Sequence, residues 1–241
     1  MEKSIKIAID LMGGEKSPDK NLEGVNIFLE RNKKAIDCFF YFFGKESQVK
    51  EKISKYKYLK NNYKLFDSKI VVSDDLSALS TIKKGKNSSM WNSIQSQIDL
   101  GTDVTLSAGN TGVLLVMSKM ILKTMEDVDK PALAGLWPNK KNMNVVLDLG
   151  ANVECSEKNL IDFSEMGSAL FKSLFPDEKA KVSLLNIGTE ETKGTELLRG
   201  SYSKLKELDK FGDFEFKGYI EGNEITNGDS NVIVTDGLQV T

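Results

Sequence analysis

The sequence predicts an α/β fold in which a mostly parallel, doubly wound sheet has helices on both faces. Short apolar runs of strand length alternate with segments whose apolar residues recur at helical spacing. This alternation is typical of parallel sheets with crossover helices. The strand-like runs are almost continuously apolar, as expected for strands that are covered on both faces.

Each predicted strand is a short apolar run that ends at a glycine or at a cluster of polar residues. The run CFFYFF, for example, is followed by Gly44, and the first run ends at Gly13 and Gly14. Gly is frequent where a chain leaves a strand, because it allows positive φ angles and close backbone approach. The predicted strands cover residues 5–10, 38–43, 69–73, 103–106, 132–137, 144–150, 182–188, 214–220 and 231–237.

Helices are predicted between these strands. Ser17 is a suitable N-cap with Pro18 at the first helical position. Ser88 and Ser89 precede apolar residues at four-residue spacing, and Gly101 closes that helix. The other helical segments cover approximately residues 49–56, 112–123, 156–174 and 194–208, and Leu76 and Leu79 begin another helical face.

The chain has 241 residues, which suits one large domain or two modest ones. Because the sequence shows no composition shift and no linker, we interpret residues 1–241 as a single α/β catalytic domain, with a small excursion within 113–180. The strand predicted at 231–237 is not followed by a helix that would cover it. The pattern therefore predicts either that the sequence is incomplete at its C-terminal end or that the chain is naturally shortened.

Composition excludes several classes of chemistry. The chain has no histidine, which removes Ser-His-Asp and Cys-His nucleophilic systems and the usual zinc sites. Its 33 basic and 35 acidic residues give a net charge of -2, so the whole-chain charge does not favour nucleic-acid binding. Two cysteines are too few for a disulfide framework, which favours a cytoplasmic protein. The longest apolar runs are shorter than a membrane span.

Several of the loops that follow predicted strands are rich in glycine and small polar residues. Ligands bind at the carboxyl edge of open parallel sheets, and helix N-termini there favour phosphate. We therefore expect an anion-binding cleft at this edge. Its candidate phosphate- and substrate-binding residues are Gly13, Gly14, Ser88, Ser89, Ser107, Gly109, Asn110, Thr111, Gly112, Gly188 and Asp236.

The stretch SAGNTG at 107–112 runs from a predicted strand straight into a helix. One interpretation is anion binding by its backbone and polar side chains. The other is a tight turn in which Asn110 or Thr111 caps the helix, and for a single loop this is the more frequent case. The stretch does not match the dinucleotide fingerprint or the phosphate loop of ATPases, so nicotinamide and ATP cofactors lose their main support.

Three further features carry both a functional and a plain structural interpretation. Lys193, after Glu190 and Glu191, is placed to hold phosphate or a developing oxyanion, or is simply a solvated lysine. Cys155 is either a carrier of an acyl group or a small buried hydrophobic residue, and the lack of a histidine to activate it favours the second interpretation. A basic turn is either an ordinary surface or a docking site for an acidic partner, and it contains Lys83, Lys84 and Lys86.

Taken together, the loops resemble one family, the bacterial phosphate acyltransferases of phospholipid synthesis (acyl-ACP:phosphate transacylases). The matching stretches occur in the family's order and extend over almost the whole chain. They are KIAIDLMGG (6–14), KNSSM (86–90), SAGNTGVLL (107–115), PALA (131–134), LDLGANVEC (147–155), LLNIGTEETKG (184–194), IEGNEI (220–225) and VIVTDG (232–237).

The resemblance implies a fold similar to that of isocitrate and isopropylmalate dehydrogenases and of phosphotransacetylase. It also implies transfer of a fatty acyl group from acyl carrier protein to inorganic phosphate, without a cofactor or metal. It implies a cytoplasmic homodimer that works at the inner face of the membrane, with a membrane acyltransferase using the acyl phosphate. The chain departs from the family pattern at Glu15 and Lys16, and at Val240 and Thr241, where a Gly-Asn step is expected.

In the expected mechanism, phosphate attacks the thioester carbonyl directly. The loop at 107–112 and the helix start at Ser88 and Ser89 hold phosphate, and Lys193 balances charge on phosphate or on the oxyanion. Asn152 and Asn186 orient the acyl carbonyl. The alternatives are a phosphate acetyl- or butyryltransferase that uses coenzyme A, a dehydrogenase of similar fold, and an inactive truncated chain that only binds a partner.

Overall fold

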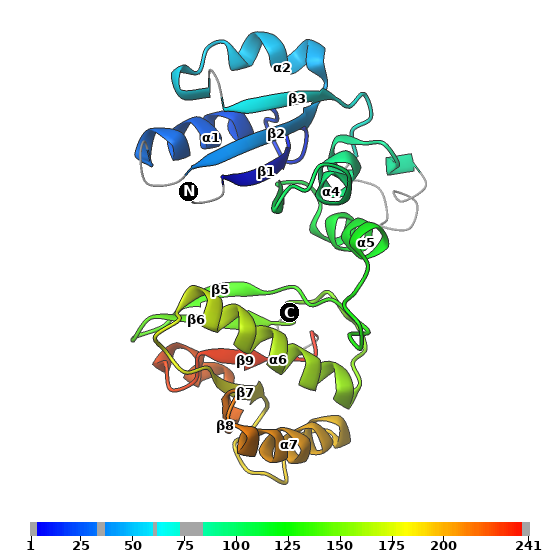
Figure 1. Ribbon diagram of the computed structural model, residues 1–241. Helices are drawn as coiled ribbons and strands as arrows, with labels where there is room; N and C mark the ends of the chain where they lie inside the picture. Colours follow the sequence, from blue (N-terminus) through cyan, green and yellow to red (C-terminus); the bar gives the residue numbers. More distant parts are fainter. Residues whose placement is uncertain (1–3, 33–36, 60–61, 73–83, 238–241) are drawn as a thin grey trace. The chain divides into compact units, whose positions relative to one another are not determined.

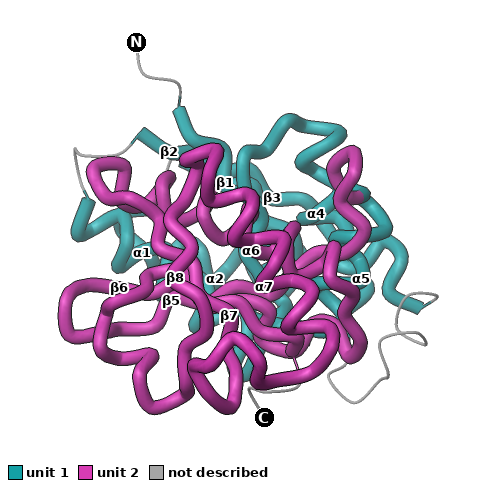
Figure 2. Tube along the Cα trace, turned by 90° about the horizontal axis from the view of Figure 1, so that it is seen from below, with its two compact units in different colours: residues 1–123 teal, residues 124–241 magenta. Residues whose placement is uncertain are grey.

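The computed structural model describes residues 4–32, 37–59, 62–72 and 84–237. The chain divides into two compact units, Met1–Lys123 and Thr124–Thr241 (Figure 2). Each unit has its own sheet with helices packed on it (Figure 1), so the predicted fold class is confirmed, with two sheets where the sequence suggested one. The single catalytic domain over residues 1–241, with a small excursion within 113–180, stays a prediction.

Unit 1 is built on a four-stranded, fully parallel sheet with the order β3-β2-β1-β4. Its strands are β1 (Ile5–Asp10), β2 (Cys38–Gly44), β3 (Tyr63–Asp67) and β4 (Val104–Ser107). In the register of the sheet, Ile9 lies between Phe42 and Leu106, and Asp10 pairs with Ser107. The loops after β1 and β4 therefore leave the sheet side by side.

Helices cover both faces of this sheet, because alternate residues of each strand point to opposite faces. On one face, α1 (Asp19–Arg31) and α2 (Glu46–Ile53) enclose an apolar core with the aromatic residues of β2, and η1 (Lys57–Leu59) follows α2. On the other face, α4 (Ser89–Asp99) packs against β1 and β4 and against α5 (Thr111–Leu122).

Two local predictions in unit 1 are wrong. Residues 69–72 form no strand beyond a single bridge from Ile70 to Ser88, and β3 lies earlier, at Tyr63–Asp67. In this edge strand Lys64 and Asp67 are exposed and the other three residues are only partly buried, so it lacks the continuous apolar run of a central strand. Ser17 does not cap α1: its hydroxyl donates to the Met12 carbonyl, and Pro18 is the N-cap. Leu76 and Leu79, which begin another predicted helical face, lie outside the described residues.

Unit 2 has a five-stranded sheet with the order β5-β6-β9-β7-β8. Its strands are β5 (Gly135–Pro138), β6 (Met143–Leu147), β7 (Lys181–Leu185), β8 (Glu215–Ile220) and β9 (Val232–Val234). β5 is antiparallel to β6, and the other pairs are parallel. The last strand in the sequence, β9, is central in the sheet, and all three of its residues are buried.

The helices of unit 2 are α6 (Glu157–Leu174) and α7 (Glu196–Leu208), and they share one apolar core with the sheet. Ser156 caps α6 as predicted, in a reciprocal capping box with Asn159. Two 3₁₀ segments, η2 (Asp209–Phe211) and η3 (Gly222–Asn227), precede and follow β8. Within the described residues, no helix has both the length and the apolar character needed to cross a membrane.

The core of unit 2 depends on Phe163 of α6, whose side chain is fully buried. Replacing Phe163 by Ala should lower the free energy of unfolding by about 3–5 kcal/mol, because a large cavity is left behind. Urea denaturation measures this change. Leu174→Ala, near the exposed end of the same helix, is the control and should change the free energy by less than about 1 kcal/mol. Equal effects of the two changes would contradict this assignment of the core.

Candidate active site

A buried carboxylate joins the two neighbouring loops of unit 1. Asp10, at the end of β1, accepts a hydrogen bond from the Met12 N–H at 3.1 Å and from the Ser107 hydroxyl at 2.7 Å. The Ser107 oxygen in turn accepts the N–H of Gly109 at 3.1 Å. This chain of hydrogen bonds fixes the start of the SAGNTG loop against the loop after β1.

The glycines of these loops are needed for close packing. A Cβ on Gly13 would lie 2.7 Å from both the Asp10 carboxylate and the Gly109 nitrogen, and one on Gly14 would lie 2.8 Å from the Ala108 carbonyl oxygen. No side chain fits at such distances, so the two loops meet backbone to backbone. Small residues at this junction are therefore explained by packing between loops, whatever else approaches them.

The polar residues around the two helix starts of unit 1 act first as caps. Ser88 is fully buried and its hydroxyl accepts the N–H of Trp91, and Ser89 is also buried. Asn110 accepts the N–H of Val113 and so caps α5, as the structural interpretation of the SAGNTG loop expected. Thr111 and Gly112, in the first turn of α5, are exposed. The positive end of the α5 dipole is thus open to an anion at these two residues.

A second buried carboxylate organises the loop after β6 in unit 2. Asp148 is fully buried and accepts the backbone N–H groups of Leu133, Ala151 and Asn152 at 2.8–3.0 Å. The side-chain amide of Asn152 donates to Asp148 and to the carbonyl of Pro131. Both amide hydrogens of Asn152 are therefore used inside the loop, which makes Asn152 a residue that shapes the loop.

Asn186 has a similar role after β7. Its side chain is almost fully buried; its carbonyl oxygen accepts the N–H of Ile187, and its amide donates to the Lys193 carbonyl at 3.3 Å. Gly194 lies directly against it, since a Cβ there would be 2.7 Å from the Asn186 oxygen. Asn186 thereby holds the two ends of the loop from Ile187 to Gly194 together.

Lys193 carries the charge of this loop. Its aliphatic stem lies over Gly188, where an added Cβ would be 2.6 Å from Lys193 Cδ, and its ammonium is 3.1 Å from Glu190 Oε1. The pKa of Glu190 is lowered, first by a hydrogen bond from the backbone N–H of Glu190 and then by a hydrogen bond from Lys193. The Lys193 side chain is about half exposed, so its ammonium is open to a solvent-borne anion.

Cys155 and Asp236 lie together at the same edge of unit 2. The Cys155 sulfur is 3.5 Å from the Asp236 carbonyl oxygen, and the side chain is partly buried against the main core. Burial raises the pKa of the Cys155 thiol, and the nearby Asp148 carboxylate raises it further. At neutral pH the group is therefore a thiol, which is a poor nucleophile and agrees with the role predicted for it.

The two aspartates are the site residues that the sequence analysis missed. Both Asp10 and Asp148 directly follow an apolar strand and precede a glycine-containing loop. A carboxylate at that position, with no positive neighbour in sequence, is a recognisable signal for a buried acceptor of loop N–H groups. Of the predicted basic turn, Lys84 and Lys86 are exposed and Lys83 lies outside the described residues.

A protein-family comparison identifies the chain's relatives. Residues 5–241 match the family described as "Fatty acid synthesis protein". The chain is 53% identical over 238 residues to the phosphate acyltransferase of Pelagibacter ubique, and 38% identical over 236 residues to that of Agrobacterium fabrum. The chain belongs to the phosphate acyltransferase family. The predicted family and the acyltransferase class are confirmed.

The alignments cover 99% and 97% of this chain, but 70% of the Pelagibacter ubique protein and 65% of the Agrobacterium fabrum protein. The fold is also that of solved phosphotransacetylases. The EutD phosphotransacetylase from Staphylococcus aureus matches with a TM-score of 0.67 and 16% identity, over 98% of this chain and 78% of its own. A phosphotransacetylase from Streptococcus pyogenes matches with a TM-score of 0.70 and 15% identity, over 99% and 79%. At these identities the likeness concerns the fold.

In this chain, Asp148 should be essential for the shape of the loop after β6. Replacing Asp148 by Asn puts an NH₂ group among N–H donors and should lower the free energy of unfolding by about 1–3 kcal/mol. Urea denaturation measures the loss. Asp177→Asn, in an exposed turn of the same unit, is the matched control and should have little effect. A loss no larger than that of the control would contradict the role given to Asp148.

Proposed function

We propose that the chain catalyses transfer of a fatty acyl group from acyl carrier protein to inorganic phosphate, forming an acyl phosphate for phospholipid synthesis. The observation that carries this proposal is the 53% identity to a phosphate acyltransferase, in an alignment that covers 99% of the chain. The geometry is consistent with it, because both sheets place small, tightly held loops at the carboxyl ends of their strands.

The proposed reaction needs no nucleophile from the protein. A phosphate oxygen attacks the carbonyl carbon of the thioester, and a tetrahedral oxyanion forms. The carbon–sulfur bond then breaks and the carrier thiolate leaves, taking up a proton. The protein must hold the phosphate, orient the thioester and stabilise the oxyanion. A chain without histidine and with a partly buried, protonated Cys155 is suited to this direct attack.

Eight of the candidate residues receive a role in this proposal. Lys193 balances the charge of phosphate or of the oxyanion, after its ammonium leaves Glu190. Thr111 and Gly112 bind phosphate at the start of α5. The loop before them is held by Ser107 and by close packing against Gly13 and Gly14. Asn152 and Asn186 orient the acyl carbonyl through the loops they hold.

The partners proposed for this enzyme follow from the same chemistry. Acyl carrier protein is acidic, and the exposed Lys84 and Lys86 offer it a basic docking surface. We further propose a cytoplasmic homodimer that associates with the inner face of the membrane and delivers acyl phosphate to a membrane acyltransferase.

The proposed function is tested by incubating the chain with fatty acyl carrier protein and phosphate and trapping acyl phosphate with hydroxylamine. Hydroxamate that depends on both phosphate and protein is the expected result. The same assay with acyl-coenzyme A shows which donor is used, and faster transfer from coenzyme A would replace the proposed donor. No hydroxamate with either donor would refute the activity for this chain and favour a binding role.

Replacing Lys193 by Ala should lower turnover by about a hundredfold, as expected when a charge that stabilises the oxyanion is removed. Glu190→Gln breaks the same ion pair but keeps the ammonium, so it should retain turnover and lower the KM for phosphate. Steady-state kinetics with varied phosphate separates the two variants. Turnover of Lys193→Ala equal to that of the unchanged chain would remove Lys193 from the mechanism.

A further inference from the structure

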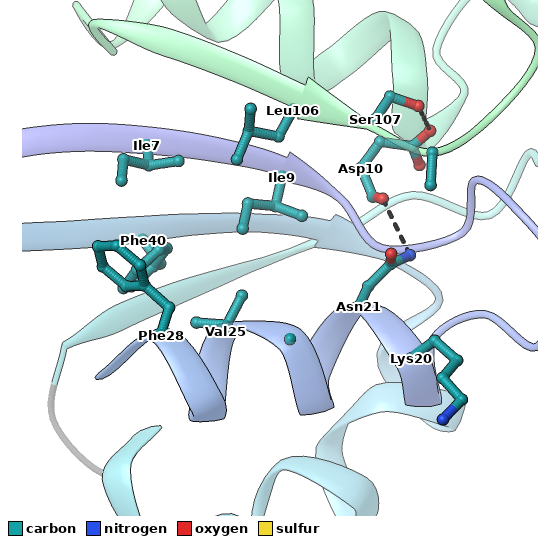
Figure 3. Close-up of a pocket in the computed structure, with 12 residues that line it drawn as sticks. Ile7, Ile9, Asp10, Lys20, Asn21, Val25, Phe28, Phe40, Leu106 and Ser107 are labelled. Carbon is teal, nitrogen blue, oxygen red and sulfur yellow. Dashed lines mark hydrogen bonds between the residues drawn. The ribbon is translucent and has the colours of Figure 1, made fainter. Parts of the chain in front are cut away.

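Unit 1 contains an apolar groove between α1 and the strands β1 and β4, shown in Figure 3. Its volume is about 390 Å³, which lies within the range of pockets that bind small molecules. Its lining residues come from both sides of the groove: Ile7, Ile9, Asp10, Lys20, Asn21, Gly24, Val25, Phe28, Phe40, Leu106, Ser107 and Ala108.

The two ends of the groove differ in chemistry (Figure 3). Around Phe28 and Phe40 the walls are hydrocarbon, formed by aliphatic and aromatic side chains. At the other end lie Asp10, Asn21 and Ser107. Asn21 donates to the carbonyls of Leu11 and Gly13, and so belongs to the loops of the candidate phosphate site. The groove thus runs from a wholly apolar end to the candidate site.

The groove is open because neither of its sides fills it. β4 is the last strand of the described sheet, and Leu106, on its α1 face, is 50% exposed. On the facing helix, Gly24 presents no side chain, and a Cβ added there would have no atom within 4 Å. An apolar surface of this kind, beside a candidate catalytic loop, favours a ligand with a hydrocarbon part.

We propose that this groove binds the hydrocarbon chain of the fatty acyl substrate, with its methyl end near Phe28 and Phe40 and its carbonyl end near Ser107. The proposal rests on the proposed function and names where the acyl chain lies. Among the lining residues, Asp10 and Lys20 carry the charges, and both lie at the end next to the candidate site. An amphiphile with one polar head matches this distribution.

The test is binding of a fluorescent fatty acid to the 241-residue chain, with displacement by saturated fatty acids of increasing length. Each added methylene that enters the groove should tighten binding about fourfold, until the groove is filled. Gly24→Phe should weaken fatty-acid binding at least tenfold, because the ring occupies the open space at that position. Leu106→Glu, which places a charge in the apolar wall, should weaken it similarly.

The matched control is Ile27→Phe, which adds a ring to the exposed side of the same helix, outside the groove lining. Its fatty-acid affinity should equal that of the unchanged chain. Equal affinities of Gly24→Phe and Ile27→Phe, or binding that does not depend on chain length, would overturn the proposal. If the two variants bind fatty acid equally well but Gly24→Phe is less stable than Ile27→Phe, a segment of the protein itself uses the groove. This result also overturns the proposal.

Lys193→Ala separates this inference from the proposed function, since Lys193 does not line the groove. If the groove binds the acyl chain, this variant keeps its fatty-acid affinity whether or not turnover falls. Acyl transfer that persists at full rate with long-chain donors in Gly24→Phe would overturn the groove while leaving the function intact. Length-dependent binding that Gly24→Phe abolishes, in a chain without transfer, would support the groove and refute the function.

Discussion

A buried carboxylate at the end of a strand is the interaction on which both candidate loop systems depend. Asp10 and Asp148 each occupy a position with almost no solvent access. An ionised carboxylate is costly to bury unless hydrogen-bond donors surround it. The loops that follow must therefore turn their N–H groups, or a hydroxyl, inward onto these oxygens. This single requirement fixes the path of the backbone at the carboxyl edges of both sheets.

The same requirement decides which groups remain available for chemistry. The side-chain amides of Asn152 and Asn186 are used within their own loops, and Ser107 links Asp10 to Gly109. Among the described residues of these loops, the half-exposed ammonium of Lys193, which is paired with Glu190, and the exposed first turn of α5 are accessible to solvent. Each of the two is positive, so the tightly held loops of each unit present charge to an anion while contributing no nucleophile of their own. That division suits a reaction in which the anion itself attacks.

The groove beside α1 has a related physical origin. The parallel register places Leu106 next to Ile9 on the α1 face, while α1 carries Gly24 where a larger residue would close the gap. Asn21 of the same helix holds the loop after β1. One helix thus both supports the candidate phosphate loop and leaves a hydrocarbon-lined space next to it. An acyl chain and a phosphate need these two environments side by side.

By itself, the sequence determined the fold class, most of the strands and helices, and the family. Apolar periodicity and capping residues such as Ser88 and Ser156 are local signals, and local signals are readable from neighbouring residues. The tertiary structure alone decided the division into two sheets, the edge strand at Tyr63–Asp67, and the partners of Asp10. Asp10 and Ser107 are 97 residues apart and meet only because strand register pairs them. Register and side-chain partners arise from packing between distant segments, which no short stretch of sequence encodes.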